Sequence, residues 1–184
     1  MKTESLAMYV LRLAGTLFLI TAIVALALAG VNSVTAPAIA KLTAEKTQAA
    51  IEAVLPGGYE TMVENYADET GLVSKVYKGA NGYALEVLPG GFDNVITMMV
   101  GVDFDGNVLG ISIVKHTETA GLGAVAAANT SAGESFRGQF VGQSGSVSVS
   151  KDGGQIEAIT GATITSRAVC VGVQAALDCV ANLG

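Results

Sequence analysis

Hydroxyl side chains gather near the C-terminus, in residues 157–166 (EAITGATITS). An apolar run ends at Ile159, and Gly161 and Ala162 then allow a tight turn and a close approach of the backbone to a ligand. A helical pattern follows, and the first N–H groups of a helix have no partner within it and form the positive end of its dipole. The segment therefore has the chemistry of an anion site. The alternative is an ordinary N-terminal cap, the commonest use of Thr and Ser at a helix start.

A second segment, residues 115–123 (KHTETAGLG), holds the only histidine of the chain. His116 has two interpretations, as a structural hydrogen-bonding residue and as a site residue. Residues 121–126 (GLGAVA) also fit the dinucleotide fingerprint G-x-G-x-x-A. We reject that fingerprint, because residues 117–121 separate the preceding strand from the turn and no acidic residue follows about 20 positions later at a strand end.

Both segments resemble motifs of one family of FMN-binding domains. Residues 160–165 (TGATIT) resemble the flavinylation motif [S/T]GA[S/T]x[S/T], and Glu157 precedes it where the family usually has Asp. Residues 116–123 resemble the loop H-x-E-T-P-G-L-G, with Ala120 in place of Pro and therefore a less rigid loop. The family includes the G subunit of the Rnf ferredoxin:NAD oxidoreductase complex and the C subunit of the sodium-pumping NADH:quinone oxidoreductase. Chain length favours the Rnf subunit.

The resemblance implies a covalent cofactor. The last hydroxyl of the motif, here Thr165, would carry FMN through a phosphoester that a flavin transferase installs from FAD with Mg²⁺. The N-terminus of the last helix would then hold the remaining negative charge of the phosphodiester. The same resemblance implies flavin contacts from residues of both segments: Glu118, Thr119, Gly121, Leu122, Gly123, Thr160, Gly161, Ala162, Thr163 and Ser166.

We expect an electron relay rather than an independent enzyme. The resemblance places the chain with the other Rnf subunits in a membrane complex that couples electron transfer between ferredoxin and NAD⁺ to translocation of Na⁺ or H⁺. The sequence shows no nucleotide-binding motif and no second redox centre, so we expect no independent NADH dehydrogenase activity. Five Phe, five Tyr and no Trp predict a partly exposed flavin ring rather than a deep aromatic cage. Two alternatives stay open, a membrane-anchored extracytoplasmic flavoprotein carrier outside an ion pump and a non-redox binding module.

The N-terminal part predicts an anchor in the lipid bilayer. Residues 13–31 are almost wholly apolar, and they are long enough to cross a hydrocarbon core of about 30 Å. A cleaved signal peptide is the rival, with an A-x-A site at residues 27–29, but the run exceeds the usual apolar region of about 7–15 residues. Positive charges are equal on the two sides, so charge alone does not orient the helix. We expect a tail at residues 1–12, a transmembrane helix at 13–31, and an extracytoplasmic FMN-binding domain at 32–184.

The rest of the chain predicts an α+β domain built on an antiparallel sheet with flanking helices. Turn signals at residues 79–82 (GANG) and 105–107 (DGN) predict two hairpins, and 152–154 (DGG) predict a third. The strands are expected at 72–77, 83–88, 95–104, 108–115, 147–150 and 155–159. Helices are expected at 43–55, 124–129, 134–140 and 167–183.

Composition excludes several classes of protein. The net charge is −6 and no basic stripe is present, whereas a nucleic-acid binder needs clustered Lys and Arg. Cys170 and Cys179 are nine positions apart in one predicted helix, on opposite sides of its axis, so they do not pair with each other. Neither has metal-ligand spacing. We expect two small apolar residues and no metal site.

Overall fold

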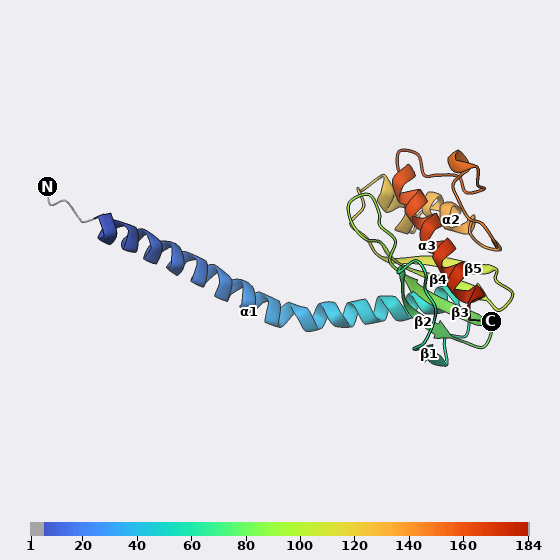
Figure 1. Ribbon diagram of the computed structural model, residues 1–184, viewed down its shortest axis with the longest axis horizontal. Coiled ribbons are helices and arrows are strands. Elements are labelled where there is room, and N and C mark those ends of the chain that lie inside the picture. Colours follow the sequence, from blue (N-terminus) through green and yellow to red (C-terminus); the bar gives the residue numbers. More distant parts are fainter. Residues whose placement is uncertain (1–5, 184) are drawn as a thin grey trace. The chain divides into compact units, whose positions relative to one another are not determined.

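The computed structural model describes residues 6–183, and contacts divide the chain into two compact units, one up to Ala44 and one from Glu45 (Figure 1). The first unit is helical. Its helix α1, Leu6–Val54, continues past Pro37 and extends into the second unit. The helices predicted at 13–31 and 43–55 are therefore parts of one continuous helix.

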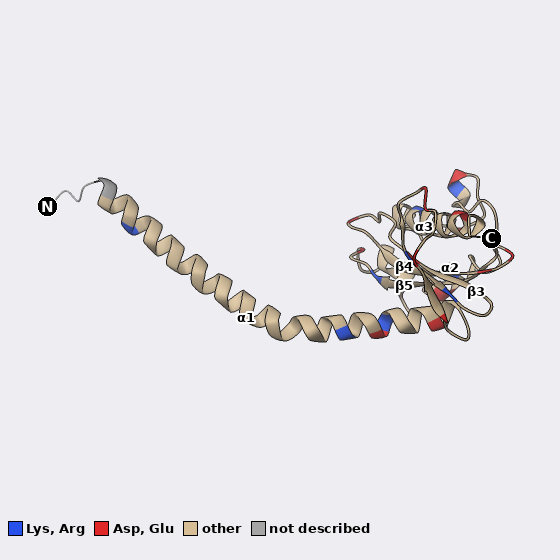
Figure 2. Ribbon diagram, turned by 60° about the horizontal axis from the view of Figure 1, so that its bottom comes forward, with Lys and Arg blue, Asp and Glu red and all other residues tan. Residues whose placement is uncertain are grey.

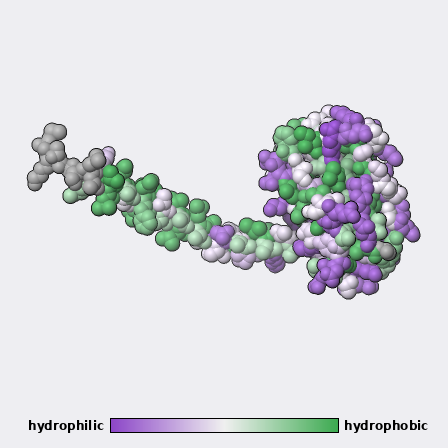
Figure 3. All heavy atoms as spheres, in the orientation of Figure 1, coloured by the Kyte–Doolittle hydropathy of each residue, from purple (hydrophilic) through white to green (hydrophobic). Residues whose placement is uncertain are grey.

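Helix α1 has the surface of a membrane span. An 18-residue window within it has a mean hydropathy of 2.3 and is not buried, and Figure 3 shows hydrophobic atoms along it. The sequence has no charged residue between Arg12 and Lys41, and Figure 2 shows a long uncharged stretch of this helix. Hydroxyls within this stretch donate to carbonyls about one turn earlier, at 2.8 Å from Thr16 to Leu13 and 2.9 Å from Thr35 to Val31. They are thus satisfied inside the helix, as an apolar surrounding requires.

The second unit is built on a five-stranded antiparallel sheet in the order β1-β2-β3-β4-β5. The strands are β1 Thr61–Val63, β2 Val73–Lys78, β3 Gly82–Val87, β4 Thr97–Asp103 and β5 Val108–Lys115. The hairpins predicted at 79–82 and 105–107 join β2 to β3 and β4 to β5, and both are confirmed, as is the α+β class. Strand β1 was not predicted.

Both faces of the sheet are covered within this unit. One face packs against α3 (Thr163–Ala181) and the short helices η1 (Gly123–Ala127) and α2 (Ser131–Gly138). The last turn of α1 covers the other face, with Ile51 and Val54 against Tyr77 and Met99. Strand β3 is therefore buried along its whole length. Its side chains alternate between the two cores, with Leu85 facing α3 and Ala84 facing α1.

Helix α3 is the central helix of the second unit. It also has the length and hydropathy of a membrane span, but 67% of its apolar window is buried, which identifies it as a core helix. Cys170 and Cys179 are free and buried in it, as expected. Burial raises the pKa of the Cys170 thiol to about 12 and that of Cys179 to about 11. Both thiols stay protonated at neutral pH and are poor nucleophiles.

The hairpin predicted around residues 152–154 is wrong. Val149 and Ile156 form an isolated parallel bridge, and Ser150–Asp152 form the 3₁₀ turn η2. The Asp152 carboxylate accepts hydrogen bonds from Arg167 of α3 at 2.6 and 2.7 Å. This pair ties η2 to α3, and the segment is a loop beside the helix rather than two strands of the sheet.

Candidate functional site

The site is built on the N-terminus of α3. Gly161 precedes the helix with φ 77°, a left-handed conformation that favours glycine, and the turn closes where the Ala162 N–H donates to the Ile159 carbonyl at 2.9 Å. The N-cap residue is Ala162, and no side chain caps the helix. The capping alternative therefore does not apply here. The amides of the first turn have no intrahelical partner, and they remain available to an anion.

A cleft of about 330 Å³ lies beside this helix start. The residues that line it come from the two segments with sequence motifs and from other segments that were not predicted. The predicted residues that line it are Glu118, Thr119, Leu122, Gly123, Gly161, Ala162, Thr163 and Thr165. The additional lining residues are Phe92, Lys151 and Ile164. The predicted residues Gly121, Thr160 and Ser166 are not among the residues that line it.

Thr165 and Glu118 meet at the buried side of the cleft. The Thr165 hydroxyl donates a hydrogen bond to Oε2 of Glu118, and the Phe92 N–H donates to Oε1 at 2.9 Å. Thr165 is 2% exposed and Glu118 is 7% exposed. Gly123 makes their contact possible, because a Cβ at this position would collide with Oγ1 of Thr165 and Oε2 of Glu118. A hydroxyl and a carboxylate from distant segments are thus held together.

The three hydroxyls at the start of α3 have different partners. Ser166 donates to the Ala162 carbonyl and accepts from the Ile159 N–H, both at 3.0 Å, so it ties the turn to the helix. Thr163 accepts from Lys151 at 3.3 Å. Thr165 alone of these three contacts a carboxylate.

The loop before η1 positions Glu118. Nδ1 of His116 accepts a hydrogen bond from the Glu118 N–H at 3.3 Å. The Thr119 carbonyl accepts from the Leu122 N–H at 3.2 Å, which folds the loop into a turn. This hydrogen bond of His116 is therefore structural, because it supports the backbone of the loop.

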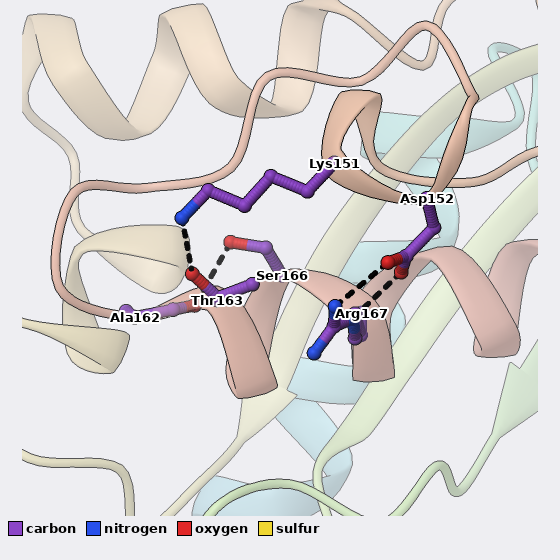
Figure 4. A network of polar contacts seen from close by, with 6 residues as sticks. All are labelled: Lys151, Asp152, Ala162, Thr163, Ser166 and Arg167. Atoms are coloured by element: carbon purple, nitrogen blue, oxygen red, sulfur yellow. Dashed lines mark hydrogen bonds and ion pairs between the residues drawn. The ribbon is translucent and has the colours of Figure 1, made fainter.

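Lys151 brings a positive charge to the same cleft (Figure 4). Lys151 belongs to η2, and the next residue of this turn, Asp152, is bound by Arg167. The hydrogen bonds from Arg167 lower the pKa of Asp152. The ion pair thus positions the turn that carries Lys151. Lys151 was not predicted as a site residue, because residue 151 falls between the strands expected at 147–150 and 155–159. Its positive charge beside a turn was the only local signal.

Glu157 does not take part in the cleft. Its side chain is exposed and does not line it. Its backbone makes the contacts: the N–H donates to Oε1 of Gln139 at 2.7 Å, and the carbonyl accepts from Nε2 of Gln139 at 3.3 Å. The acidic position ahead of the motif therefore supports the turn through its main chain.

The arrangement suits a ligand with an anionic end and an apolar end. Free helix amides and Lys151 supply positive potential to the cleft. Phe92, Leu122 and Ile164 line it and are 64%, 43% and 50% exposed, so they offer apolar surface at its opening. Within residues 6–183 no group of three or more His, Cys, Asp or Glu side chains is placed to hold a metal ion.

Comparisons with known proteins agree with this geometry. A family model described as an FMN-binding domain matches residues 91–178, which include every residue that lines the cleft. The G subunit of the Na⁺-translocating ferredoxin:NAD⁺ oxidoreductase complex of Acetobacterium woodii is 34% identical, over 95% of this chain and 93% of its own length. The G subunit of the ion-translocating oxidoreductase complex of Methanosarcina acetivorans is 33% identical, over 90% and 91%. A proton-translocating counterpart from Clostridium ljungdahlii is 45% identical over 48% of this chain and 47% of its own.

Proposed function

The chain belongs to the family of G subunits of ion-translocating oxidoreductase complexes, and we propose that it relays electrons there through one FMN joined covalently to Thr165. The observation that carries this proposal is the position of the Thr165 hydroxyl, which lines a cleft at the N-terminus of α3. A phosphate attached there would lie against free helix amides.

The residues of the cleft fit FMN. The first-turn amides of α3 and the ammonium of Lys151 suit the phosphate, and the apolar side chains of Phe92, Leu122 and Ile164 suit the flavin ring. A volume of about 330 Å³ is at the lower end of the range for ligand sites, roughly 300–1,000 Å³. We therefore place part of the ring outside the cleft, where a partner subunit can approach it. FMN, when bound, supplies chemistry that accepts and donates electrons one or two at a time.

The remaining site residues are proposed in two groups. Glu118, Thr119, Gly123, Gly161, Ala162 and Thr163 contact the cofactor from the cleft lining. Gly121, Thr160 and Ser166 act indirectly, by shaping the two turns that form the cleft. Ser166 does so through its two hydrogen bonds within the turn at Gly161.

We place the chain in a membrane by α1. Residues 13–31 span the bilayer after the first 12 residues of the chain, and residues 32–184 carry FMN on the extracytoplasmic side. The partners are the other subunits of an Rnf-type complex and, during maturation, a flavin transferase. The complex would couple electron transfer between ferredoxin and NAD⁺ to translocation of Na⁺ or H⁺. Similarity over nine-tenths or more of two such G subunits favours this role over a carrier outside a pump.

Purification of the tagged full chain from its native membranes tests the proposal. We expect it to bring down a multisubunit complex, and its own band should fluoresce as a flavoprotein after denaturing electrophoresis. A chain that purifies alone, or a band without fluorescence, would contradict the proposal.

A further inference from the structure

The geometry points to Glu118 as the general base that activates Thr165 for attachment of the flavin. The chain would then supply a catalytic group to its own modification, while the transferase supplies the flavin donor and Mg²⁺. This role rests on the covalent attachment proposed above. It assigns a chemical function to the contact between the Glu118 carboxylate and the Thr165 hydroxyl.

A base is needed because a threonine hydroxyl is a weak nucleophile. A positioned carboxylate within hydrogen-bond reach of the reacting hydroxyl meets the geometric requirement for general base catalysis. Oε2 of Glu118 accepts directly from Oγ1 of Thr165. Its other oxygen is fixed by the Phe92 N–H at 2.9 Å, so the carboxylate is held in one orientation. Both side chains are more than nine-tenths buried, which strengthens their interaction.

A purely structural hydrogen bond does not require this partner. Ser166, the next residue, donates to the Ala162 carbonyl of its own helix at 3.0 Å, which is the usual local solution for a hydroxyl in a helix. Thr165 instead donates to a carboxylate 47 residues away in sequence. Thr163, the third hydroxyl, has Lys151 as its partner. The contact with Glu118 therefore also explains why Thr165, rather than its neighbours, is the attachment site.

The surroundings of Glu118 leave its Oε2 to the Thr165 hydroxyl. Within the described part of the chain it forms no ion pair with Lys or Arg. The charged or titratable groups that the cleft and its hydrogen bonds bring near it are His116, whose ring accepts from the Glu118 N–H, and Lys151, which lines the same cleft. Neither forms a hydrogen bond with the Thr165 hydroxyl, so neither competes with Glu118 as its base.

The step balances without any oxidant or reductant. Oγ of Thr165 forms a bond to the phosphorus of the FMN half of FAD. The bond from that phosphorus to the bridging oxygen breaks, and AMP leaves with that oxygen. The proton of the Thr165 hydroxyl moves to Oε2 of Glu118. The carboxyl is then neutral, so the new phosphodiester and Glu118 do not place two negative charges side by side.

The test follows flavin attachment to the full-length chain. The chain is made without a flavin transferase, purified in detergent, and mixed with purified transferase, FAD and Mg²⁺. Initial rates come from fluorescence in denaturing gels, and peptide masses locate the attached flavin. Glu118→Gln keeps the size of the side chain and removes the base. Glu86→Gln is the matched control. Glu86 is also buried, at 8% exposed, but it pairs with Lys75 at 3.5 Å and does not line the cleft.

We expect Glu118→Gln to slow attachment about 10²–10⁴-fold, the usual contribution of a general base, and Glu86→Gln to leave the rate within about threefold. Glu118→Asp, which keeps a carboxylate on a shorter arm, should react faster than Glu118→Gln. The ratio of wild-type to Glu118→Gln rates should fall toward one in acid, because protonation removes the base from the wild type alone. The pH dependence of the transferase cancels in this ratio.

The outcomes separate the two proposals. Flavin on Thr165 of the wild type, with equal rates for wild type and Glu118→Gln, would overturn the role of Glu118 and leave the attachment site standing. A ratio that does not change with pH, or an Asp variant slower than the Gln variant, would show that Glu118 only positions Thr165. Flavin found on another residue of the wild type would overturn the attachment site and this role together.

Discussion

The hydroxyl of Thr165, in the first turn of α3, donates a hydrogen bond to the carboxylate of Glu118, in the loop that follows β5. The two residues are 47 positions apart, and each comes from one of the two segments that carry the sequence motifs. Their contact joins those segments into one site. It depends on Gly123, whose missing side chain leaves the space that both groups fill.

Gly123→Ala should separate Thr165 from Glu118. The new methyl group would collide with the side chains of both Thr165 and Glu118, so the loop must move, at a cost of about 1–3 kcal/mol in the free energy of unfolding. We expect a lower melting temperature and a large loss of flavin attachment. Gly138→Ala is the matched control, because a Cβ there meets nothing within 4 Å at the end of α2. Normal attachment to the Gly123→Ala chain would show that the close contact is not required.

Lys151→Ala should weaken the flavinylated form more than the unmodified form. Its ammonium lies at the cleft where we place the phosphodiester, and before attachment it donates a hydrogen bond to the neutral hydroxyl of Thr163. We expect the melting temperature of the flavinylated chain to fall by up to about 4 °C more than that of the unmodified chain, less at high salt. Lys46→Ala, outside the cleft, should change the melting temperatures of the two forms equally. An equal shift for both forms of Lys151→Ala would contradict the phosphate contact.

The fold was predictable where local pattern and tertiary structure agree. The turns at 79–82 and 105–107 gave the hairpins of the sheet, because their residues favour tight turns between apolar runs. The turn at 152–154 gave the same signal and was misleading, because Val149 and Ile156 pack into the core with α3 and pair in parallel rather than as a hairpin. Separate helices were expected at 13–31 and 43–55, since nothing in the pattern shows that the residues between them continue the helix.

The site was predictable only where its residues lie in a local sequence motif. Motif resemblance identified Thr165 and Glu118 as site residues, but their hydrogen bond is a product of the fold and has no local signal. Phe92 and Lys151 line the cleft from segments without a motif. Ser166 has the right residue type in the right segment, yet its hydroxyl is used by the turn.

The isolated chain should not oxidise NADH. The cleft is large enough for only part of one flavin. Residues 121–126 fold as a turn and the 3₁₀ helix η1 rather than as a dinucleotide-binding strand and helix. Mixed anaerobically with NADH, the flavin of the purified full chain should bleach slowly or not at all, and dithionite should bleach it promptly. Rapid, saturable reduction by NADH would reveal a nucleotide site and place the chain among dehydrogenases.

The apolar part of α1 should remain in the mature protein as a membrane anchor. Its 18-residue window of mean hydropathy 2.3 is long enough to span the hydrocarbon core. Carbonate extraction of native membranes should leave the chain in the pellet, and N-terminal sequencing should find residues ahead of Leu13. A mature chain that begins near Gly30 would identify this segment as a cleaved signal instead.

Covalent attachment of FMN to Thr165 is the central claim, and peptide mass mapping of the native chain tests it most directly. The peptide that contains Thr165 should carry the added mass of FMN, and Thr165→Ser should retain it because the hydroxyl is kept. Thr165→Ala should carry no covalent flavin and still fold, since the lost hydrogen bond to Glu118 costs only about 1–3 kcal/mol. Thr163→Ala should still carry flavin on Thr165. A folded Thr165→Ala chain that retains covalent flavin would contradict the account.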